Sequence, residues 1–269
     1  VLGEPDQPMV FLLHGWMDVS ASFQFLVDAL ARDWCIIAPD WRGFGRSAWS
    51  ENPYYFPEYF ADLDRLIDHY QPGTPVNLIG HSMGGNVAGL YAGIRPYRAA
   101  KLALLEGFGL KPTEANQAPA RLTKWLDQLK EPPSFKTYGS VEEFAKRLQQ
   151  NNRRLTFDRA LYIAEHSCHE TSPGKFELLS DPAHKLTNPV LYRLEEAKAC
   201  WSLISAPTLW ITGADSEFMR MQVASPEDYA ARKACFKQLH EEIIADCGHM
   251  MHHDQPQALA ALLEAFFAG

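Results

Sequence analysis

Short apolar runs alternate with amphipathic stretches along most of the chain. Between the first two apolar runs, Phe23, Leu26, Val27 and Leu30 recur at the spacing of one helix face, and residues 57–70 repeat this pattern. The apolar runs are expected to form strands at 9–13, 34–38, 76–79, 101–106, 208–212 and 241–245. Strands that alternate with helices predict an α/β fold whose central sheet is mostly parallel and flanked by helices.

The interval between Gly107 and Ala206 departs from this alternation. It holds roughly a hundred residues without a clear strand, far more than the loops of compact domains contain. Helical patterns occupy most of it, at 116–130, 140–150, 156–167 and 188–204. We therefore expect an α/β core formed by residues 1–106 and 207–269, with an all-helical cap at 107–206 that lies over the C-terminal ends of the strands.

The composition narrows the classes of partner. The chain has 269 residues with 33 acidic and 25 basic side chains, and its net charge of −8 argues against nucleic acids and anionic membranes. No apolar run reaches the length of a membrane-spanning helix, and residues 1–10 lack the pattern of a signal peptide. The five cysteines form no CxxC pair, which favours a reducing, cytoplasmic setting. A small molecule is the expected partner, and the sequence leaves the oligomeric state open.

The stretch "NLIGHSMGG" ends a predicted strand with a serine between glycines. Gly80 and Gly84 flank Ser82 in the pattern G-x-S-x-G, in which the serine occupies a strained turn from a strand into a helix. Such a turn exposes the serine hydroxyl and directs the backbone N–H of the next residue, Met83, toward the same point. Ser82 is therefore a candidate nucleophile, and Met83 is a candidate oxyanion donor.

A second oxyanion donor is expected after the first strand. The first apolar run ends in "HGWMD", where the turn through His14 and Gly15 offers the backbone N–H of Trp16. Two N–H groups directed at one point would stabilise the negative charge that develops on a carbonyl oxygen under attack. The alternative is an ordinary tight turn.

A histidine near the C-terminus is the candidate base. His249 directly follows the last predicted strand, and the unperturbed pKa of an imidazole lies near neutral pH. His252 and His253 are expected to belong to the start of the final helix, and His81 is expected to support the turn at Ser82. The cluster offers no second group with ligand spacing and no HExxH motif, so no metal site is expected.

Four motifs, "HGW", "DWRGFGRS", "GHSMGG" and "GHMMHHDQP", together resemble the α/β-hydrolase family over nearly the whole chain. The resemblance implies the α/β-hydrolase fold, with Ser82 as nucleophile, Met83 and Trp16 as oxyanion donors and His249 as base. It implies no cofactor. The acid of the triad departs from the usual pattern, because Ser216 stands where the family generally has aspartate. Asp215, one residue earlier, and Glu106, at the end of the strand before the insertion, are equal candidates.

The reaction itself has more than one interpretation. The leading hypothesis is a serine hydrolase that cleaves a small or medium apolar ester, with Trp41 and Phe108 among the aromatic residues expected to contact the substrate. For any one of these aromatics, a place in the core is an equal alternative. The second hypothesis is a cofactor-independent oxygenase with His249 as general base, because "HGW", "WRGFG" and an acid at Glu106 are also similar to the cofactor-free quinolone dioxygenases of this fold. A catalytically silent binding protein is the third.

Overall fold

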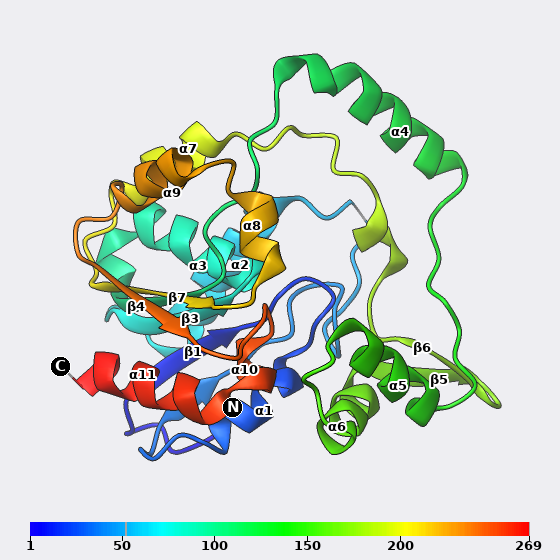
Figure 1. Ribbon diagram of the computed structural model, residues 1–269, viewed down its shortest axis with the longest axis horizontal. Coiled ribbons are helices and arrows are strands. Elements are labelled where there is room, and N and C mark those ends of the chain that lie inside the picture. Colours follow the sequence, from blue (N-terminus) through cyan, green and yellow to red (C-terminus); the bar gives the residue numbers. More distant parts are fainter. Residues whose placement is uncertain (52, 269) are drawn as a thin grey trace.

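The computed structural model describes residues 1–51 and 53–268, and a six-stranded parallel sheet forms its centre (Figure 1). The strand order is β2-β1-β3-β4-β7-β8, and each pair of neighbours in this order is parallel. The strands are β1 (Met9–Leu13), β2 (Cys35–Ile37), β3 (Val76–His81), β4 (Ala99–Leu105), β7 (Thr208–Gly213) and β8 (Leu239–Ile244). All six predicted strands are thus present, and the prediction of an α/β fold with a largely parallel sheet is confirmed.

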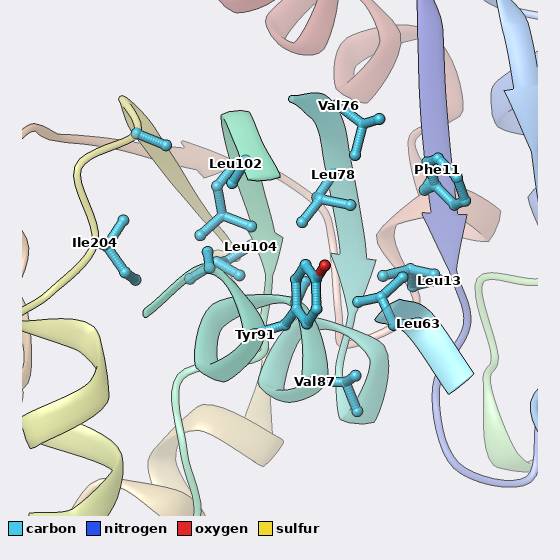
Figure 2. Close-up of a cluster of buried hydrophobic side chains, with 14 of the residues drawn as sticks. Phe11, Leu13, Leu63, Val76, Leu78, Val87, Tyr91, Leu102, Leu104 and Ile204 are labelled. Atoms are coloured by element: carbon cyan, nitrogen blue, oxygen red, sulfur yellow. The ribbon is translucent and has the colours of Figure 1, made fainter. Parts of the chain in front are cut away.

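Alternate residues of β1, β2, β3, β4 and β7 enter two separate apolar layers, because successive side chains of a strand point to opposite faces of the sheet. The edge strand β8 differs, since its residues 240–243 are exposed. In β1, Phe11 and Leu13 pack in one layer, while Val10 and Leu12 pack in the other. Figure 2 shows the first layer, in which Tyr91 of the helix after β3 lies among side chains of the neighbouring strands. Burial on both faces explains why the strands read as continuous apolar runs.

Helices cover both layers (Figure 1). The first layer includes side chains of α2 (Phe56–Tyr70), α3 (Met83–Ile94) and α7 (Leu194–Trp201), with α8 (Glu217–Gln222) and α9 (Pro226–Lys233) beside them. The second layer is covered by α1 (Gln24–Val27), α10 (Met251–Asp254) and α11 (Pro256–Ala268). Within the described residues, no helix is both long and apolar enough to cross a membrane.

Residues 107–206 connect β4 to β7, and we call them the insertion segment. Its helices are α4 (Ala118–Lys130), α5 (Val141–Asn151), α6 (Phe157–Ser167) and α7, close to the predicted positions. The expectation of an all-helical segment is wrong, because β5 (Cys168–Ser172) and β6 (Lys175–Leu178) form an antiparallel hairpin. Their sequences, CHETS and KFEL, are short and largely polar and form no apolar run, although Cys168, Phe176 and Leu178 pack into the core of this segment. The two strands pair with each other and do not belong to the six-stranded sheet.

The parts of the insertion segment pack in different ways. α5, α6 and the hairpin share a small apolar core of their own around Phe144, Leu155 and Ile163. α7 instead packs against α3, and Trp201 lies in the first layer of the main core, so the end of the segment belongs to the core rather than to a cap. α4 contains no buried residue and stands away from the sheet (Figure 1).

Candidate active site

Ser82 occupies the turn between β3 and α3 in a strained backbone conformation. Its φ of 52° and ψ of −114° lie outside the regions that side chains with a Cβ normally adopt. The strain is fixed from two sides, since the N–H of Ser82 donates to the carbonyl of Leu105 at 2.8 Å and its own carbonyl accepts from Asn86 at 3.0 Å. Ser82 is therefore held rigidly at the N-terminus of α3.

The two glycines of the motif are required by the close approach of backbones. A Cβ on Gly80 would lie 2.4 Å from the carbonyl oxygen of Gly84, and a Cβ on Gly84 would lie 2.1 Å from the carbonyl oxygen of Leu13. Real Cβ atoms do not approach so closely, and backbone atoms cannot move aside as a flexible side chain could. The pattern around Ser82 thus reflects packing of β1, β3 and α3 on one another.

His249 follows β8 and is held by a buried carboxylate. Its Nδ1 lies 2.7 Å from Oε2 of Glu106, whose side chain is fully buried, while the imidazole itself is 26% exposed. The ring of Phe218 packs against the imidazole, with 4.2 Å between ring centroids. Because a carboxylate oxygen only accepts, Nδ1 carries the hydrogen of this bond, and Nε2 is left as the acceptor.

Glu106 is itself fixed by two further hydrogen bonds. Its Oε1 accepts from the N–H of Gly213 at 2.9 Å, and its Oε2 accepts from the hydroxyl of Ser216 at 2.5 Å. Ser216 is the residue at the position where the family generally has the acid. In this chain its hydroxyl donates to Oε2 of Glu106, the same oxygen that faces Nδ1 of His249.

Asp215 does not lie beside Nδ1 of His249. The prediction that Asp215 and Glu106 are equal candidates for the acid is therefore corrected. Its carboxylate is about half exposed and accepts from the guanidinium of Arg154 at 2.6 Å. Arg154 lies between α5 and α6, so this ion pair joins the insertion segment to the core. The carboxylate beside His249 therefore comes from the end of β4, before the insertion segment, and not from the end of β7, after it.

Residues with strained backbone conformations lie around this site. Among residues 1–51 and 53–268, the non-glycine residues with positive φ are Met17, Ser82, Glu106 and Asp246. Each lies just beyond the C-terminal end of a strand of the central sheet, namely β1, β3, β4 and β8. Such conformations persist only where the surroundings enforce them, and they concentrate at functional sites.

A buried group of histidine and aspartate side chains lies next to His249. Nε2 of His81 donates to the carbonyl of His249 at 2.8 Å and so holds the backbone that carries the candidate base. Asp18, His81 and His252 are buried, with their ligand atoms within 4.8 Å of one another, so they are side chains that could hold a metal ion. Asp18 has protein partners as well, because Oδ2 accepts from Ser22 at 2.8 Å and lies 3.6 Å from Nε2 of His252.

Burial sets the charges in this group. It lowers the pKa of His81 well below the ordinary value and lowers the pKa of His253 to about 3. For Asp18, burial alone would raise the pKa, but the hydrogen bond to His252 and the charge of that residue lower it below its usual range. Near pH 7, His81 and His253 are therefore neutral and Asp18 is ionised.

Ser82 and His249 line one cavity of about 640 Å³, which we call the first cavity. Met83 and Trp16 line it too, and Met83 is the first residue of α3, where N–H groups have no partner within the helix. Their role as oxyanion donors stays a prediction. The indole of Trp16 is 54% exposed at the cavity wall. Most of the remaining wall is aromatic or apolar: Pro53, Tyr54, Tyr55, Phe56, Tyr59, Leu110, Trp125, Leu186, Pro189 and Phe218.

The two aromatic residues expected to contact substrate lie elsewhere. Trp41 and Phe108 are each 1% exposed and belong to the first layer of the core, and neither lines the first cavity. Trp41 is turned inward by two hydrogen bonds to His14, one to its carbonyl and one to Nε2. Phe108 packs on Trp210 with 3.7 Å between ring centroids. Their expected role in substrate binding is therefore corrected to a structural one.

The sequence did not predict several of the residues that line the first cavity. Phe218 and Asn86 line the first cavity, as does His184, which stacks between Phe44 and Tyr54 and whose pKa burial lowers to about 4. None of them belongs to a motif. Only Asn86 carried a signal, as a polar residue in the otherwise small and apolar sequence of α3; its side chain accepts from the N–H of Gly109 at 2.7 Å.

Known proteins resemble the chain along almost its entire length. A family model described as alpha/beta hydrolase fold matches residues 8–256. A serine hydrolase-like protein of Danio rerio is 29% identical over 269 residues, covering 96% of this chain and 80% of that protein. A 3-hydroxybutyrate-oligomer hydrolase of Cupriavidus necator is 28% identical over 280 residues, covering 99% and 91%. Among solved structures, the thioesterase domain from the curacin biosynthetic pathway superposes with a TM-score of 0.86 at 27% identity, covering 100% of this chain and 93% of that one.

Proposed function

This chain belongs to the α/β-hydrolase family and is an enzyme of that class, and we propose that it is a serine hydrolase that cleaves a small or medium apolar ester or related acyl compound through an acyl-enzyme on Ser82. One observation carries the proposal: a serine on a strained turn shares a cavity with a histidine whose Nδ1 is bonded to the buried Glu106. This combination supplies a nucleophile, a base and an orienting acid.

In the proposed first step, Oγ of Ser82 attacks the carbonyl carbon while Nε2 of His249 accepts the hydroxyl proton. The tetrahedral intermediate collapses when the leaving alcohol takes that proton from the imidazolium, which leaves an ester on Ser82. Water then attacks this ester by the same route and releases the acid. Glu106 keeps its negative charge, holds the imidazole in the required tautomer and stabilises its protonated form.

The backbone N–H groups of Met83 and Trp16 are the proposed oxyanion donors. They follow Ser82 and the first strand, respectively, and both residues line the first cavity. Each donor of this kind contributes about a hundred- to a thousand-fold in rate, because it is already oriented toward the charge before that charge develops. Ser82 directly precedes α3, whose first N–H groups have no partner within the helix, and this supports the role of Met83.

The wall of the first cavity supports an apolar acyl substrate. Trp125, His184 and Asn188 come from the insertion segment, so we propose that the part of this segment before α7 acts as a cap that shapes the cavity from above the strand ends. Similar proteins are named as hydrolases of an oligomeric ester and of a thioester, which agrees with acyl transfer to water. His184 is held in this wall between Phe44 and Tyr54, and its Nε2 faces the carbonyl of Arg42 at 3.2 Å.

A panel of p-nitrophenyl esters of graded acyl length tests the proposal. We expect hydrolysis of the apolar esters, and we expect Ser82→Ala to lower kcat by about a million-fold, because nucleophile and base act as a unit. Thermal melting of the variant separates loss of chemistry from loss of fold. Retention of most of the activity by Ser82→Ala would remove the acyl-enzyme from the mechanism.

A cofactor-independent oxygenase with His249 as general base is the second candidate, and the pairing of His249 with Glu106 favours it as much as it favours the hydrolase. The strained geometry of Ser82 has no necessary part in that chemistry. Oxygen uptake with 3-hydroxy-4-quinolones separates the two candidates. Uptake that survives Ser82→Ala and disappears in His249→Asn would favour the oxygenase.

A further inference from the structure

A second cavity, of about 870 Å³, adjoins the first. The two share Tyr55, Phe56, Asn86, Leu110 and Asn188 as wall residues, so they lie side by side. The proposed catalytic residues line only the first cavity. A ligand that fills both cavities therefore has its reacting carbonyl at one end and a remote part beyond the shared wall.

The inner wall of the second cavity suits a hydrocarbon chain. It is formed by Phe60 of α2, Leu90 of α3, and Ala197 and Trp201 of α7. Each cavity has the size of a small-molecule site, and an apolar chain that leaves water for such a wall gains about 25 cal/mol for each Å² of buried surface.

The charges of the second cavity differ from those of the whole protein. The chain carries a net charge of −8, yet Lys111, Arg121 and Arg193 line this cavity with Glu196 as the acidic residue beside them. Glu196 is already paired, since its Oε1 lies 3.7 Å from Nε of Arg193. Within residues 1–51 and 53–268, neither Lys111 nor Arg121 has a carboxylate partner within 4.0 Å. The second cavity therefore combines an apolar wall with cations that lack counter-charges.

Arg121 is the best placed of these cations. It lies on α4, its side chain is half-buried, and its guanidinium donates to the carbonyl of Asn188 at 3.0 Å. Asn188 belongs to the wall that the two cavities share, so this bond fixes the guanidinium near their junction. Most of the donors of the guanidinium remain open, and its planar fork matches the two oxygens of a carboxylate.

We propose that the second cavity binds the anionic end of the substrate, and that the substrate is an apolar acyl ester whose chain ends in a carboxylate or a similar anion. The inference rests on the proposed ester hydrolysis and extends it to a substrate class. The ester carbonyl lies at Ser82, the hydrocarbon chain passes Leu110 in the shared wall, and the anionic group reaches Arg121. Lys111 adds a second positive charge at the outer rim.

Two esters of equal acyl carbon number test the inference: the p-nitrophenyl monoester of suberic acid and p-nitrophenyl octanoate. We measure the ratio of kcat/KM for the anionic ester to kcat/KM for the neutral one. We expect Arg121→Gln to lower this ratio about ten- to a hundred-fold, the usual contribution of a charge-assisted hydrogen bond. Lys124→Gln removes the same charge from the same helix but outside the second cavity, and it should leave the ratio unchanged. High salt should lower the wild-type ratio.

The failure of the inference is distinguishable from failure of the proposed function. If both esters are hydrolysed and Arg121→Gln leaves the ratio unchanged, the anionic subsite is wrong while ester hydrolysis stands. If neither ester is hydrolysed, ester hydrolysis fails, and calorimetric titration of Ser82→Ala with monomethyl suberate and dimethyl suberate tests the subsite alone. Tighter binding of the monomethyl ester, lost on addition of Arg121→Gln, supports the subsite. Equal binding of the two esters overturns it.

Discussion

The strand ends of the core and the insertion segment surround the same cavity in opposite ways. The core contributes Ser82 and Glu106 on strained, buried backbone and His249 on a carboxylate that is hydrogen-bonded at both oxygens. The insertion segment contributes Trp125 from α4, a helix without a buried residue, and exposes Leu126 of the same helix to 52%. The core side of the cavity is held in place by buried contacts, whereas α4 on the other side has few contacts with the rest of the protein.

This difference separates two tasks of an enzyme. Chemistry requires reacting groups to be held within a fraction of an ångström, which buried strand ends provide. Selection of substrates tolerates, and can exploit, a wall that changes with little effect on the core. The structure thus assigns the proposed reaction to the core and the proposed choice of substrate to residues such as Arg121 and Trp125. Substitutions in the core should therefore change the reaction or the stability, and substitutions in the insertion segment should have smaller effects on both.

Among the pairs of variants that compare the core with the insertion segment, the largest effect is expected at the acid. Glu106→Gln should lower kcat about ten-thousand-fold, because an amide can hold the imidazole in the wrong tautomer, as for the acid of a serine protease. Asp215→Asn breaks an exposed ion pair between core and insertion segment, so its rate should stay within a few-fold of wild type and its stability within about 1 kcal/mol. Steady-state hydrolysis of an apolar p-nitrophenyl ester, with thermal melting of each variant, makes the measurement. The reverse order of the two rates would return Asp215 to the role.

The choice between these two acids marks the limit of what the sequence could predict. The strands and the turn at Ser82 depend on local periodicity and on glycine spacing, and both were predictable. The partner of His249 depends on where two side chains end in space, which Ser216 and Arg154 decide through contacts far apart in the chain. Likewise, nothing local shows that Trp41 turns inward to His14. The hairpin of the insertion segment is short, and only Phe176 and Leu178 alternate with polar residues in it, which is too few positions to indicate a strand.

The next effect is expected on stability, from substitutions that compare how tightly the core and the insertion segment are packed. Gly84→Ala should destabilise the protein by about 3 kcal/mol or more, because the new Cβ meets the backbone of Leu13. Gly139→Ala, in the insertion segment, should change the free energy of unfolding by less than about 0.5 kcal/mol, because its nearest neighbour is the flexible end of Glu143. Urea denaturation of both variants measures the difference. Equal losses would contradict the contrast between a fixed core and a lightly packed segment.

Per pH unit, a smaller effect is expected from the pH dependence of the buried histidines. Burial lowers the pKa of His253 to about 3, so below about pH 6.5 the unfolded chain binds a proton that the folded chain does not take. Stability should therefore fall as the pH decreases from about 6.5 toward 3, by about 1.4 kcal/mol per pH unit for this one group. His253→Gln should remove one proton from this slope, with His169→Gln on the exposed hairpin as matched control. An unchanged slope in urea titrations would show that His253 is protonated in the folded state.

Covalent labelling by a fluorophosphonate probe tests the central claim most directly, because it reports the reactivity of the nucleophile without knowledge of the substrate. Intact-mass and peptide analysis should find one adduct, on Ser82, in the wild-type protein. Ser82→Ala should take up no probe, and His249→Asn should react far more slowly, because without the base the hydroxyl is a weak nucleophile. An adduct that persists in Ser82→Ala, or an unlabelled wild-type protein, would contradict the assignment of Ser82, His249 and Glu106 as one catalytic unit.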